Sequence, residues 1–406
     1  MRYIFLLIFI SIFRLHSQTI TNYTVNDGLL DNFVECITVD INDNIWIGTS
    51  IGIQMFDGVN WTIYNTSTHP EIASDNVSVI QAMSNGDVWI GTDEGVSVFD
   101  GIIWVTYNST NTNGVLNNQV KSIDEVNGGV WVGTISGVSY LIDPANPSWN
   151  SITPPDLHWS GVNSTYFDGN NTWLASPLGG ITHYENSIFT VYDTSSGLLS
   201  QNVTDLLIDP SGKKWIGTGS GISVLNSDNT NFTQHTKMYL LSPPDTLNPV
   251  VDLEMDSYGR IWAGIYVGYL AQGGVAYWNG LQWNDYDVTD GLVGTNIRDL
   301  AIDSQDNIWI ATSTGISMIS QIAYNLLDYQ TPELIYPNPT DGDINISTNN
   351  EYTDLSVYNN LGQCVFSAID TYTHSFKLDL TFLTRGIYHI VLTNNTTSTN
   401  YNLLIK

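Results

Sequence analysis

Basic residues are scarce in this sequence. Only 11 of its 406 residues are Lys or Arg, against 40 Asp and Glu, and the formal net charge is −29. Nucleic acids and anionic membrane surfaces attract proteins through clusters of Lys and Arg, so this balance argues against both as partners. Charged residues of either sign form only 13% of the chain. Uncharged polar residues must therefore build much of the surface, which suits an exported protein.

Cysteines and long apolar segments are also scarce. Cys36 and Cys364 fall in different predicted domains, so we expect no disulfide framework and interpret both as small buried residues. The apolar run 3–13 is too short to cross about 30 Å of hydrocarbon. It follows Arg2 and precedes the small residue Ser17, so residues 1–17 are predicted to be a cleaved signal peptide. We expect no membrane-spanning segment in the mature chain.

One short motif dominates the rest of the chain. A Trp followed by an aliphatic residue, Gly or Ala and usually Thr recurs seven times, at Trp46, Trp89, Trp131, Trp173, Trp215, Trp262 and Trp309. Each unit holds four short β-branched and aromatic runs, separated by Gly, Asn, Asp and Pro, and none has a helical period. Four strands in about 42 residues is the size of a propeller blade. The sequence therefore predicts an all-β fold with a seven-bladed propeller over residues 18–328.

The last unit lacks a fourth strand, and the mature N-terminus resembles the missing piece. Residues 23–29 match residues 286–292, at the end of the sixth unit, at five of seven positions. We therefore predict that residues 19–25 pair into the seventh blade, which closes the ring and covers an exposed sheet edge.

The repeat units resemble two-component regulator propeller repeats over about residues 19–320. In that family the repeats form the sensing part of membrane-bound histidine kinases, and they also occur in free exported proteins. No kinase or DNA-binding region accompanies them in this sequence. The resemblance implies a sensing or binding architecture that is separate from any output domain.

A different pattern follows a short linker, residues 329–333. Alternating apolar residues and Gly-bearing turns over residues 334–406 predict a small Ig-like antiparallel β-sandwich. Its motif positions are Pro337, Asn338, Pro339, Gly362, Gly386, Tyr388 and Lys406. In this order they resemble the C-terminal sorting domain of type IX secretion substrates. The resemblance implies delivery by the type IX machinery to the cell surface or the medium, and a bacterium of the Bacteroidetes group. An ordinary sandwich domain is the alternative.

No catalytic or metal motif stands out. Gly48–Gly52 fits the G-x-S-x-G hydrolase pattern around Ser50, but its glycines belong to the repeat turn and no helix follows. No pair among the seven histidines has zinc spacing, and no carboxylate pair is singled out for glycoside hydrolysis. We expect no cofactor, with a structural Ca²⁺ as the alternative at acidic turns that otherwise serve as ordinary turn formers. These turns begin at Asp40, Asp209, Asp256 and Asp303.

Aromatic residues that depart from the repeat give a candidate binding site. In a propeller, the loops between blades and those joining strands two and three share one face. Aromatic rings with few charges suit stacking on sugars, and loop packing without function is the alternative. The predicted rim consists of His158, Trp159, Tyr239, Tyr266 and Tyr269.

These observations favour a monomeric, non-catalytic binding protein, whose propeller recognises a polysaccharide or protein ligand. One alternative is an extracellular polysaccharide-active enzyme, a lyase or hydrolase, with its site at the propeller mouth. Another is an adhesive or structural surface protein with no discrete site.

Overall fold

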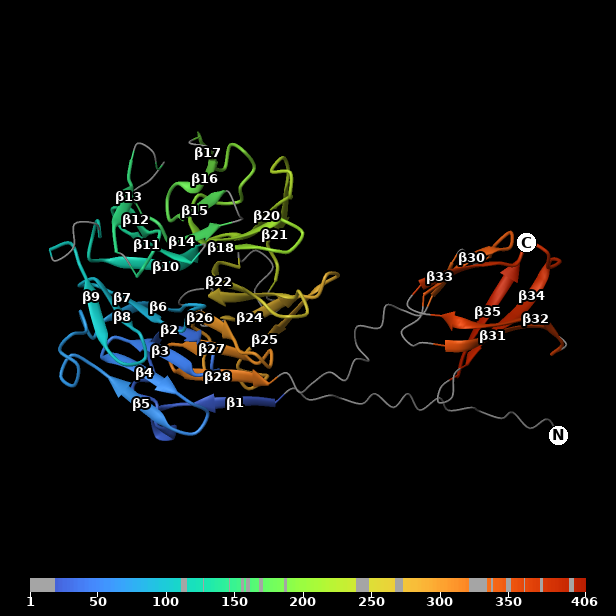
Figure 1. The fold of residues 1–406 in the computed structure, drawn as a ribbon, viewed down its shortest axis with the longest axis horizontal. Helices are drawn as coiled ribbons and strands as arrows, with labels where there is room; N and C mark the ends of the chain where they lie inside the picture. The colour runs from blue at the N-terminus through green and yellow to red at the C-terminus, as the bar shows by residue number, and fades with distance from the viewer. Residues whose placement is uncertain are drawn as a thin grey trace. The chain divides into compact units, whose positions relative to one another are not determined.

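The computed structural model describes residues 19–110, 115–126, 128–145, 147–154, 157, 161–167, 171–185, 188–238, 248–266, 273–320, 334–336, 339–347, 352–360, 362–372, 375–393 and 398–406. The chain divides into two compact units, residues 1–322 and 323–406 (Figure 1). The predicted signal peptide and linker lie outside the described residues.

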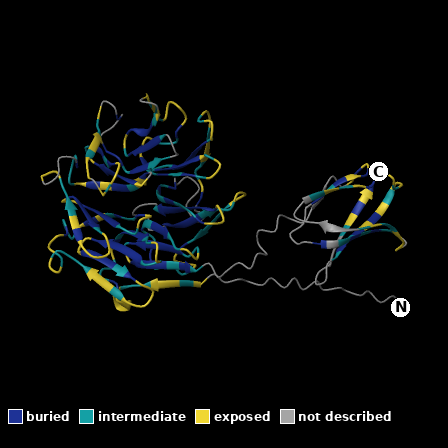
Figure 2. Cartoon of the chain, viewed as in Figure 1, coloured by how far each residue is buried: buried dark blue, intermediate teal, exposed yellow. Residues whose placement is uncertain are grey.

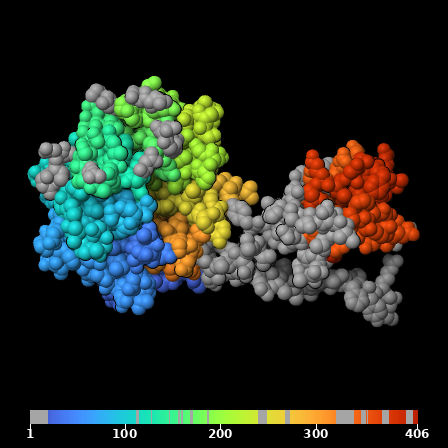
Figure 3. All heavy atoms as spheres, viewed as in Figure 1, coloured from blue at the N-terminus to red at the C-terminus, as the bar shows by residue number. Residues whose placement is uncertain are grey.

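In the first unit, the described residues form seven four-stranded antiparallel sheets. The first strand of each sheet contacts the first strands of the two neighbouring sheets, and the series returns from β26 to β2. The sheets are therefore blades around a common axis. Figure 3 shows that they follow one another in chain order, so that the blue first blade lies beside the orange seventh. The predicted seven-bladed propeller is confirmed.

Blades 1 to 4 each use four consecutive strands, with the first strand innermost. Blade 1 is β2 (Val34–Val39), β3 (Ile45–Thr49), β4 (Gly52–Phe56) and β5 (Trp61–Tyr64). Blade 2 is β6 (Val77–Ala82), β7 (Val88–Thr92), β8 (Val96–Phe99) and β9 (Trp104–Tyr107). Blade 3 is β10 (Val120–Val126), β11 (Gly129–Thr134), β12 (Gly137–Leu141) and β13 (Trp149–Ile152). Blade 4 is β14 (Ser164–Phe167), β15 (Thr172–Ser176), β16 (Gly180–Glu185) and β17 (Ile188–Tyr192).

Blades 5 and 6 follow the same order, and blade 7 differs only in its outermost strand. Blade 5 is β18 (Val203–Ile208), β19 (Lys214–Thr218), β20 (Gly221–Leu225) and β21 (Phe232–His235). Blade 6 is β22 (Val250–Met255), β23 (Ile261–Tyr266), β24 (Gly273–Trp278) and β25 (Trp283–Tyr286). Blade 7 is β26 (Ile297–Ile302), β27 (Ile308–Thr312), β28 (Gly315–Ser320) and the N-terminal strand β1 (Thr19–Tyr23).

The N-terminal strand closes the ring as predicted. Strand β1 runs antiparallel to β28, from Thr19 opposite Ser320 to Tyr23 opposite Ile316. It ends two residues before the predicted boundary, because Thr24 caps the short 3₁₀ helix η1 (Val25–Asp27) with a reciprocal capping box.

The repeated tryptophans hold adjacent blades together. All seven are buried, and the strand interiors are dark blue in Figure 2, with exposed turns in yellow. Trp46 of blade 1, for example, lies in one cluster with Ile80 and Val88 of blade 2. The Tyr64 ring from the outer strand of blade 1 stacks on Trp46 at 5.6 Å between centroids. Burying such aromatic rings contributes much of the free energy of folding.

The Gly-Thr of the Trp motif, as it stands in blade 1, has a packing reason. A Cβ atom on Gly48 would lie 2.4 Å from the Cys36 Sγ and 2.5 Å from Val77 Cγ1, so only hydrogen fits there. The Thr49 hydroxyl accepts the N–H of Ile51 at 3.2 Å and donates to the carbonyl of Gly52 at 2.9 Å. The G-x-S-x-G match is therefore a hairpin turn, and Ser50 occupies a variable position within it.

The second unit contains two antiparallel sheets around one apolar core. One sheet consists of β29 (Leu334–Tyr336), β30 (Asp343–Ser347) and β33 (Ser375–Asp379). The other consists of β31 (Tyr352–Asn359), β32 (Cys364–Tyr372), β34 (Gly386–Thr393) and β35 (Ser398–Ile405). This arrangement agrees with the predicted small sandwich.

The sorting-motif residues occupy structural positions in this unit. Gly362 adopts a left-handed φ of 76°, which a turn requires, and Gly386 begins β34. Tyr388 is buried and its hydroxyl donates to the Thr384 carbonyl at 2.8 Å, while the Lys406 N–H donates to the Thr340 carbonyl at 2.9 Å. Pro339 is exposed, and Pro337 and Asn338 lie outside the described residues.

Candidate functional site

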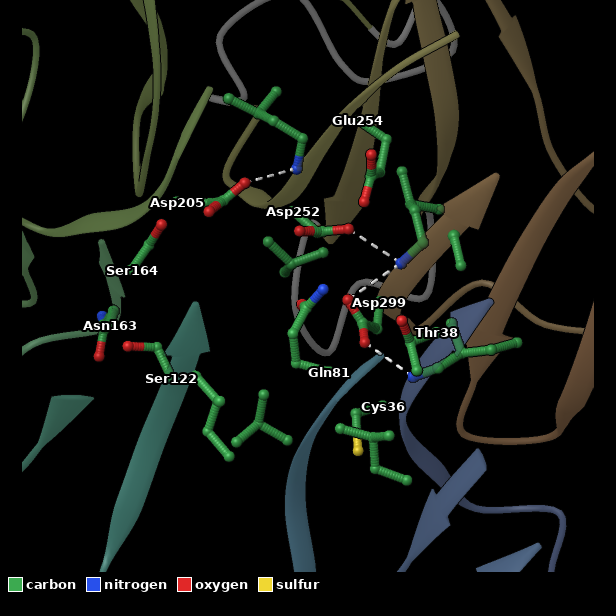
Figure 4. Close-up of a pocket in the computed structure, with 18 of the residues that line it drawn as sticks. Cys36, Thr38, Gln81, Ser122, Asn163, Ser164, Asp205, Asp252, Glu254 and Asp299 are labelled. Atoms are coloured by element: carbon green, nitrogen blue, oxygen red, sulfur yellow. Dashed lines mark hydrogen bonds between the residues drawn. The ribbon is translucent and has the colours of Figure 1, made fainter. Parts of the chain in front are cut away.

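A cavity of about 650 Å³ lies on the propeller axis and is lined by the innermost strands of all seven blades. Figure 4 shows that its labelled carboxyl groups gather mainly on the side of blades 5 to 7. The described lining residues include two basic side chains, Lys121 and Arg298, and six acidic ones, Glu35, Asp124, Asp205, Asp252, Glu254 and Asp299. The cavity is therefore polar and strongly acidic.

Three of these acids occupy one repeat position in successive blades. Asp205, Asp252 and Asp299 each follow a β-bulge near the start of the innermost strand. Each lies opposite the small residue of the Trp motif, which is Gly217, Gly264 or Ala311. In the other blades the corresponding residues are Cys36, Val79, Ser122 and Ser164.

Each of these carboxylates holds the backbone of the next blade. Asp205 Oδ2 accepts the Leu253 N–H at 3.0 Å, and Asp252 Oδ2 accepts the Leu300 N–H at 2.9 Å. Asp299 Oδ2 accepts the Ile37 N–H at 2.8 Å, which joins blade 7 to blade 1. When such a carboxyl group is ionised, its hydrogen bond to an N–H group is stronger than a neutral one. The carboxylates therefore fix the relative positions of the blades at the axis.

Different side chains carry out the same task at the other four seams between blades. Asp124 Oδ2 accepts the Thr165 N–H at 3.1 Å, and Thr38 Oγ1 accepts the Ala82 N–H at 3.4 Å. Ser78 Oγ donates to the Val120 carbonyl at 2.9 Å, and Asn163 Nδ2 donates to the Val203 carbonyl at the same distance. Every seam thus has a side-chain to backbone hydrogen bond at the innermost strands, with Asn163 lying just before β14.

Burial changes the acidity of the axial carboxyl groups. It raises the pKa of Asp124 and of Asp299 to about 7. Burial, together with the nearby charges of Asp205 and Asp299, raises the pKa of Glu254 to about 8. The pKa values of Asp205 and Asp252 are also raised, chiefly by burial. Carboxyl groups in this range can hold protons at neutral pH, which is also the range of general acids and bases.

The two basic residues lie at the bulge that begins the innermost strands. Arg298 forms an ion pair with Glu35 of the neighbouring blade, and its Nε lies 3.1 Å from Glu35 Oε2. Its guanidinium lies over the Phe33 ring, 5.5 Å from the centroid. Lys121 occupies the corresponding place in blade 3 and is exposed. The charge of Arg298 is therefore compensated by Glu35, and Lys121 adds a second positive charge at this level of the cavity.

Most of the aromatic rim predicted from the sequence cannot be placed. His158, Trp159, Tyr239 and Tyr269 lie outside the described residues. Tyr266 is half-buried at the end of β23, and its N–H donates to the Pro249 carbonyl at 3.1 Å. The grouping of the five residues at one rim stays a prediction.

The local sequence explains why the second and third strands of blade 6 are joined differently. Ile265 stands where Thr49 closes the equivalent turn in blade 1. An Ile side chain cannot form the two hydroxyl hydrogen bonds of that turn, and β23 continues through Tyr266 opposite Gly273. Residues 267–272 separate β23 from β24, whereas only residues 50–51 separate β3 from β4.

The acidic turns prove to be acceptors for the repeat tryptophans. Asp40 Oδ2 accepts the indole N–H of Trp46 at 2.9 Å, and its Oδ1 accepts the N–H groups of Asn42 and Asn44. The same indole bond recurs at 2.8–3.0 Å in the pairs Asp209–Trp215, Asp256–Trp262 and Asp303–Trp309. Within the described part of the chain, no group of three or more His, Cys, Asp or Glu is placed to hold a metal ion.

The axial acids are the main feature that sequence reasoning missed. Asp205, Asp252 and Asp299 each lie two residues after the apolar residue that begins the innermost strand of their blade. Alignment of the seven units on their tryptophans would have shown this recurrence in the last three blades.

Family models match parts of both units. Residues 334–406 match the model described as the secretion system C-terminal sorting domain, and residues 28–50 and 291–314 match the two component regulator propeller model. The chain therefore carries propeller repeats of this kind and a sorting domain, which indicates export to the outer cell surface or release. Among the described residues, no helix is long and apolar enough to cross a membrane. No curated protein matches the chain.

Several solved structures share the fold. The extracellular domain of the hybrid two-component system BT3049 from B. thetaiotaomicron matches with a TM-score of 0.63 and 17% identity, over 96% of this chain and 57% of its own length. PorZ, a surface component of the type IX secretion system of Porphyromonas gingivalis, matches with a TM-score of 0.55 and 15% identity, over 93% of this chain and 60% of its own length. This chain thus spans less than two thirds of either structure.

A third similar structure belongs to an enzyme. Virginiamycin B lyase from Staphylococcus aureus matches with a TM-score of 0.57 and 14% identity, over 75% of this chain and 99% of the lyase. At these levels of identity the three matches establish the fold alone.

Proposed function

We propose that this chain is an exported, non-catalytic binding protein whose propeller recognises a polysaccharide or protein ligand. Its sorting domain accounts for delivery by type IX secretion. The observation that carries the proposal is the use of the axial carboxylates. Asp205, Asp252 and Asp299 each accept an N–H group from the next blade, so they hold the ring together at the place where a reaction centre would lie.

We therefore expect the ligand to be recognised by the loops on the face where successive blades are joined. Blade 6 departs from the repeat on this face, with Ile265 at the position of the turn-closing Thr and Tyr266 extending the strand. Aromatic rings on a rigid scaffold suit stacking against sugar rings or apolar side chains. We therefore assign the ligand site to the predicted rim around Tyr266 and Tyr269, with His158, Trp159 and Tyr239.

The test is ligand affinity of the mature chain carrying Tyr266→Ala and Tyr269→Ala together. We expect affinity to fall at least about tenfold, because each lost aromatic contact contributes roughly 1 kcal/mol or more, with an unchanged melting temperature. The matched control is Tyr258→Ala, since Tyr258 is exposed on the β22–β23 turn at the opposite end of the same blade. Unchanged affinity in the double variant, or an equal loss in the control, would contradict the rim assignment.

An extracellular polysaccharide-active enzyme is the second candidate, and the acidity of the axial groups favours it. The pKa of Asp124 is raised to about 7 and that of Glu254 to about 8 by burial, which suits general acid–base chemistry. Polysaccharide cleavage that Glu254→Gln abolishes, while ligand affinity persists, would establish this alternative. If the parent chain cleaves no polysaccharide, binding remains the proposed function.

A further inference from the structure

The turns between strands three and four of blades 1, 2 and 6 share one pattern. An acid or amide is followed by Gly and then by an aliphatic residue, which is Val59, Ile102 or Leu281. Among the described residues these are the three most exposed large hydrophobic side chains, at 82%, 87% and 88%. The glycines before them adopt left-handed φ angles of 90–93°, and polar residues usually fill the rest of such turns. Packing within the blades therefore does not account for these three tip residues.

An aromatic pair holds each of these turns in place. In blade 1 the rings of Phe56 and Trp61, on either side of the turn, stack at 4.3 Å between centroids. The corresponding rings lie 4.8 Å apart in blade 2 and 5.7 Å apart in blade 6. Side chains on rigid hairpins lose little conformational freedom when a partner covers them, which favours binding.

The turns between strands one and two lie at the same end of the blades, because consecutive strands run antiparallel. In blades 6, 7 and 1 these turns are joined. The Ser257 N–H donates to Asp306 Oδ1 at 2.8 Å, and the Ser304 N–H donates to Asp43 Oδ1 at 2.9 Å. Ile41 of blade 1 reaches the equivalent turn of blade 2, where its Cδ1 lies 3.3 Å from the place of a Cβ on the turn glycine. This end of blades 6, 7, 1 and 2, called the turn face below, is therefore one connected surface.

The turn face is acidic. Its one basic residue, Arg260, is buried and paired with Asp256. Hydrogen bonds from the backbone N–H groups of the turns lower the pKa of Asp57 and of Asp100, so both carboxylates beside the tip residues are ionised at neutral pH. A second copy of a chain with a net charge of −29 would be repelled. The acids of these turns are Asp40, Asp43, Asp57, Asp87, Asp100, Asp256, Asp303 and Asp306.

We propose that the turn face is a docking surface for a basic protein, which covers Val59, Ile102 and Leu281 and places Lys or Arg beside the turn carboxylates. Exposed apolar side chains rimmed by polar ones are typical of interaction sites. Burial of the three aliphatic side chains provides affinity, and complementary charge provides orientation and a fast encounter. This surface lies opposite the blade-joining loops to which we assign the ligand site, and it goes beyond that proposed function without depending on it.

The test uses a synthetic amphipathic peptide of Leu and Lys as the probe, titrated into the mature chain and followed by fluorescence anisotropy. We expect saturable binding that weakens with added salt. The combined variant Val59→Ser, Ile102→Ser and Leu281→Ser should bind the peptide at least about tenfold more weakly. Its melting temperature should not change, because the three side chains are exposed. A peptide with Glu in place of Lys should not bind.

The matched control carries three Ser substitutions at the opposite end of the blades, in turns between strands two and three. These replace the exposed residues Ile51, Ile135 and Leu178, and we expect unchanged affinity for the peptide. An equal loss in this control, unchanged affinity in the tip variant, equal binding of the Glu peptide, or no saturable binding would each overturn the docking surface. If the parent chain dimerises or binds phosphatidylcholine vesicles, and the tip variant does neither, the basic partner is wrong and the surface contacts a second copy or lipid.

Discussion

Asp299 accepts the backbone N–H of Ile37 at 2.8 Å, although the two residues are 262 positions apart in the sequence. This bond closes the ring at the axis, and the pairing of β1 with β28 closes it at the outer edge. The last blade is thus secured at both ends of its sheet by residues from near the N-terminus. Ring closure is therefore the feature on which the stability of the whole propeller depends.

Removing the N-terminal strand should open the ring. Deletion of residues 18–28 exposes the edge of β28 and removes Tyr23, whose ring packs against Trp309 at 5.7 Å and Phe56 at 5.5 Å. We expect the melting temperature to fall by roughly 10 °C or more. Tyr23→Ala alone should lower the free energy of unfolding by about 3 kcal/mol, whereas Thr21→Ala on the same strand should have little effect on it. If the truncated chain has the same melting temperature as the parent chain, β1 is not needed for closure of the ring.

Loss of an acidic turn should destabilise the propeller, because its carboxylate accepts the indole N–H of a repeat tryptophan. Asp303→Ala leaves the indole N–H of Trp309 and two turn amides without their acceptor, and we expect a loss of about 2 kcal/mol in urea unfolding. Asp303→Asn keeps an oxygen and should cost less. The control is Asp57→Ala, which removes an exposed turn carboxylate that contacts no indole. If Asp303→Ala and the control lose the same free energy of unfolding, the indole hydrogen bond is not the cause of the destabilisation.

His235 should make the propeller sensitive to acid. It stacks on Trp215 at 5.7 Å where blade 1 stacks Tyr64 on Trp46, and its Nδ1 accepts the Trp283 indole N–H at 3.2 Å. Burial lowers the pKa of His235. The folded state therefore favours the neutral ring, and this stabilisation is lost as pH falls below about 6.5, where the unfolded residue gains its proton.

His235→Tyr removes this titration and introduces the Tyr that blades 1, 2, 4, 6 and 7 carry at this position. We expect the variant to melt higher than the parent at pH 5, with a smaller difference at pH 7. Comparing the two chains at each pH cancels the contribution of the axial acids. A difference that does not change with pH would contradict this role of His235.

The C-terminal unit should direct export without the propeller. A reporter with a signal peptide and residues 334–406 should appear outside the cell in a strain with type IX secretion. The same reporter without residues 334–406 should stay in the periplasm. Retention of the first reporter in the periplasm would count against the sorting role.

The sequence predicts the blades well because each carries its own signal. Trp46 and its six counterparts mark the second strands, and the match between residues 23–29 and 286–292 identifies the closing strand. The position of the axial acids could not be predicted in this way, for a physical reason. A β-bulge between Val203 and Asp205, repeated before Asp252 and Asp299, interrupts the alternation of inward and outward side chains. Alternation alone therefore cannot tell which of these residues face the axis.

The hydrogen bonds that the acidic turns accept from the tryptophans also could not be predicted from the sequence. Asp40 precedes Trp46 by six residues, and only the hairpin geometry brings its carboxylate to the indole N–H. The rim around Tyr266 was suggested by its departure from the repeat. The structure adds that Ile265 stands where Thr49 closes the equivalent turn in blade 1.

The most direct measurement is binding of the mature chain to a panel of extracellular polysaccharides and cell-surface proteins, with the bound ligand recovered and weighed by mass spectrometry. The account predicts saturable binding to one class of ligand, which is recovered unchanged. Recovery of a shortened or unsaturated polysaccharide would contradict a non-catalytic function. The absence of saturable binding to any member of the panel would contradict the binding function itself.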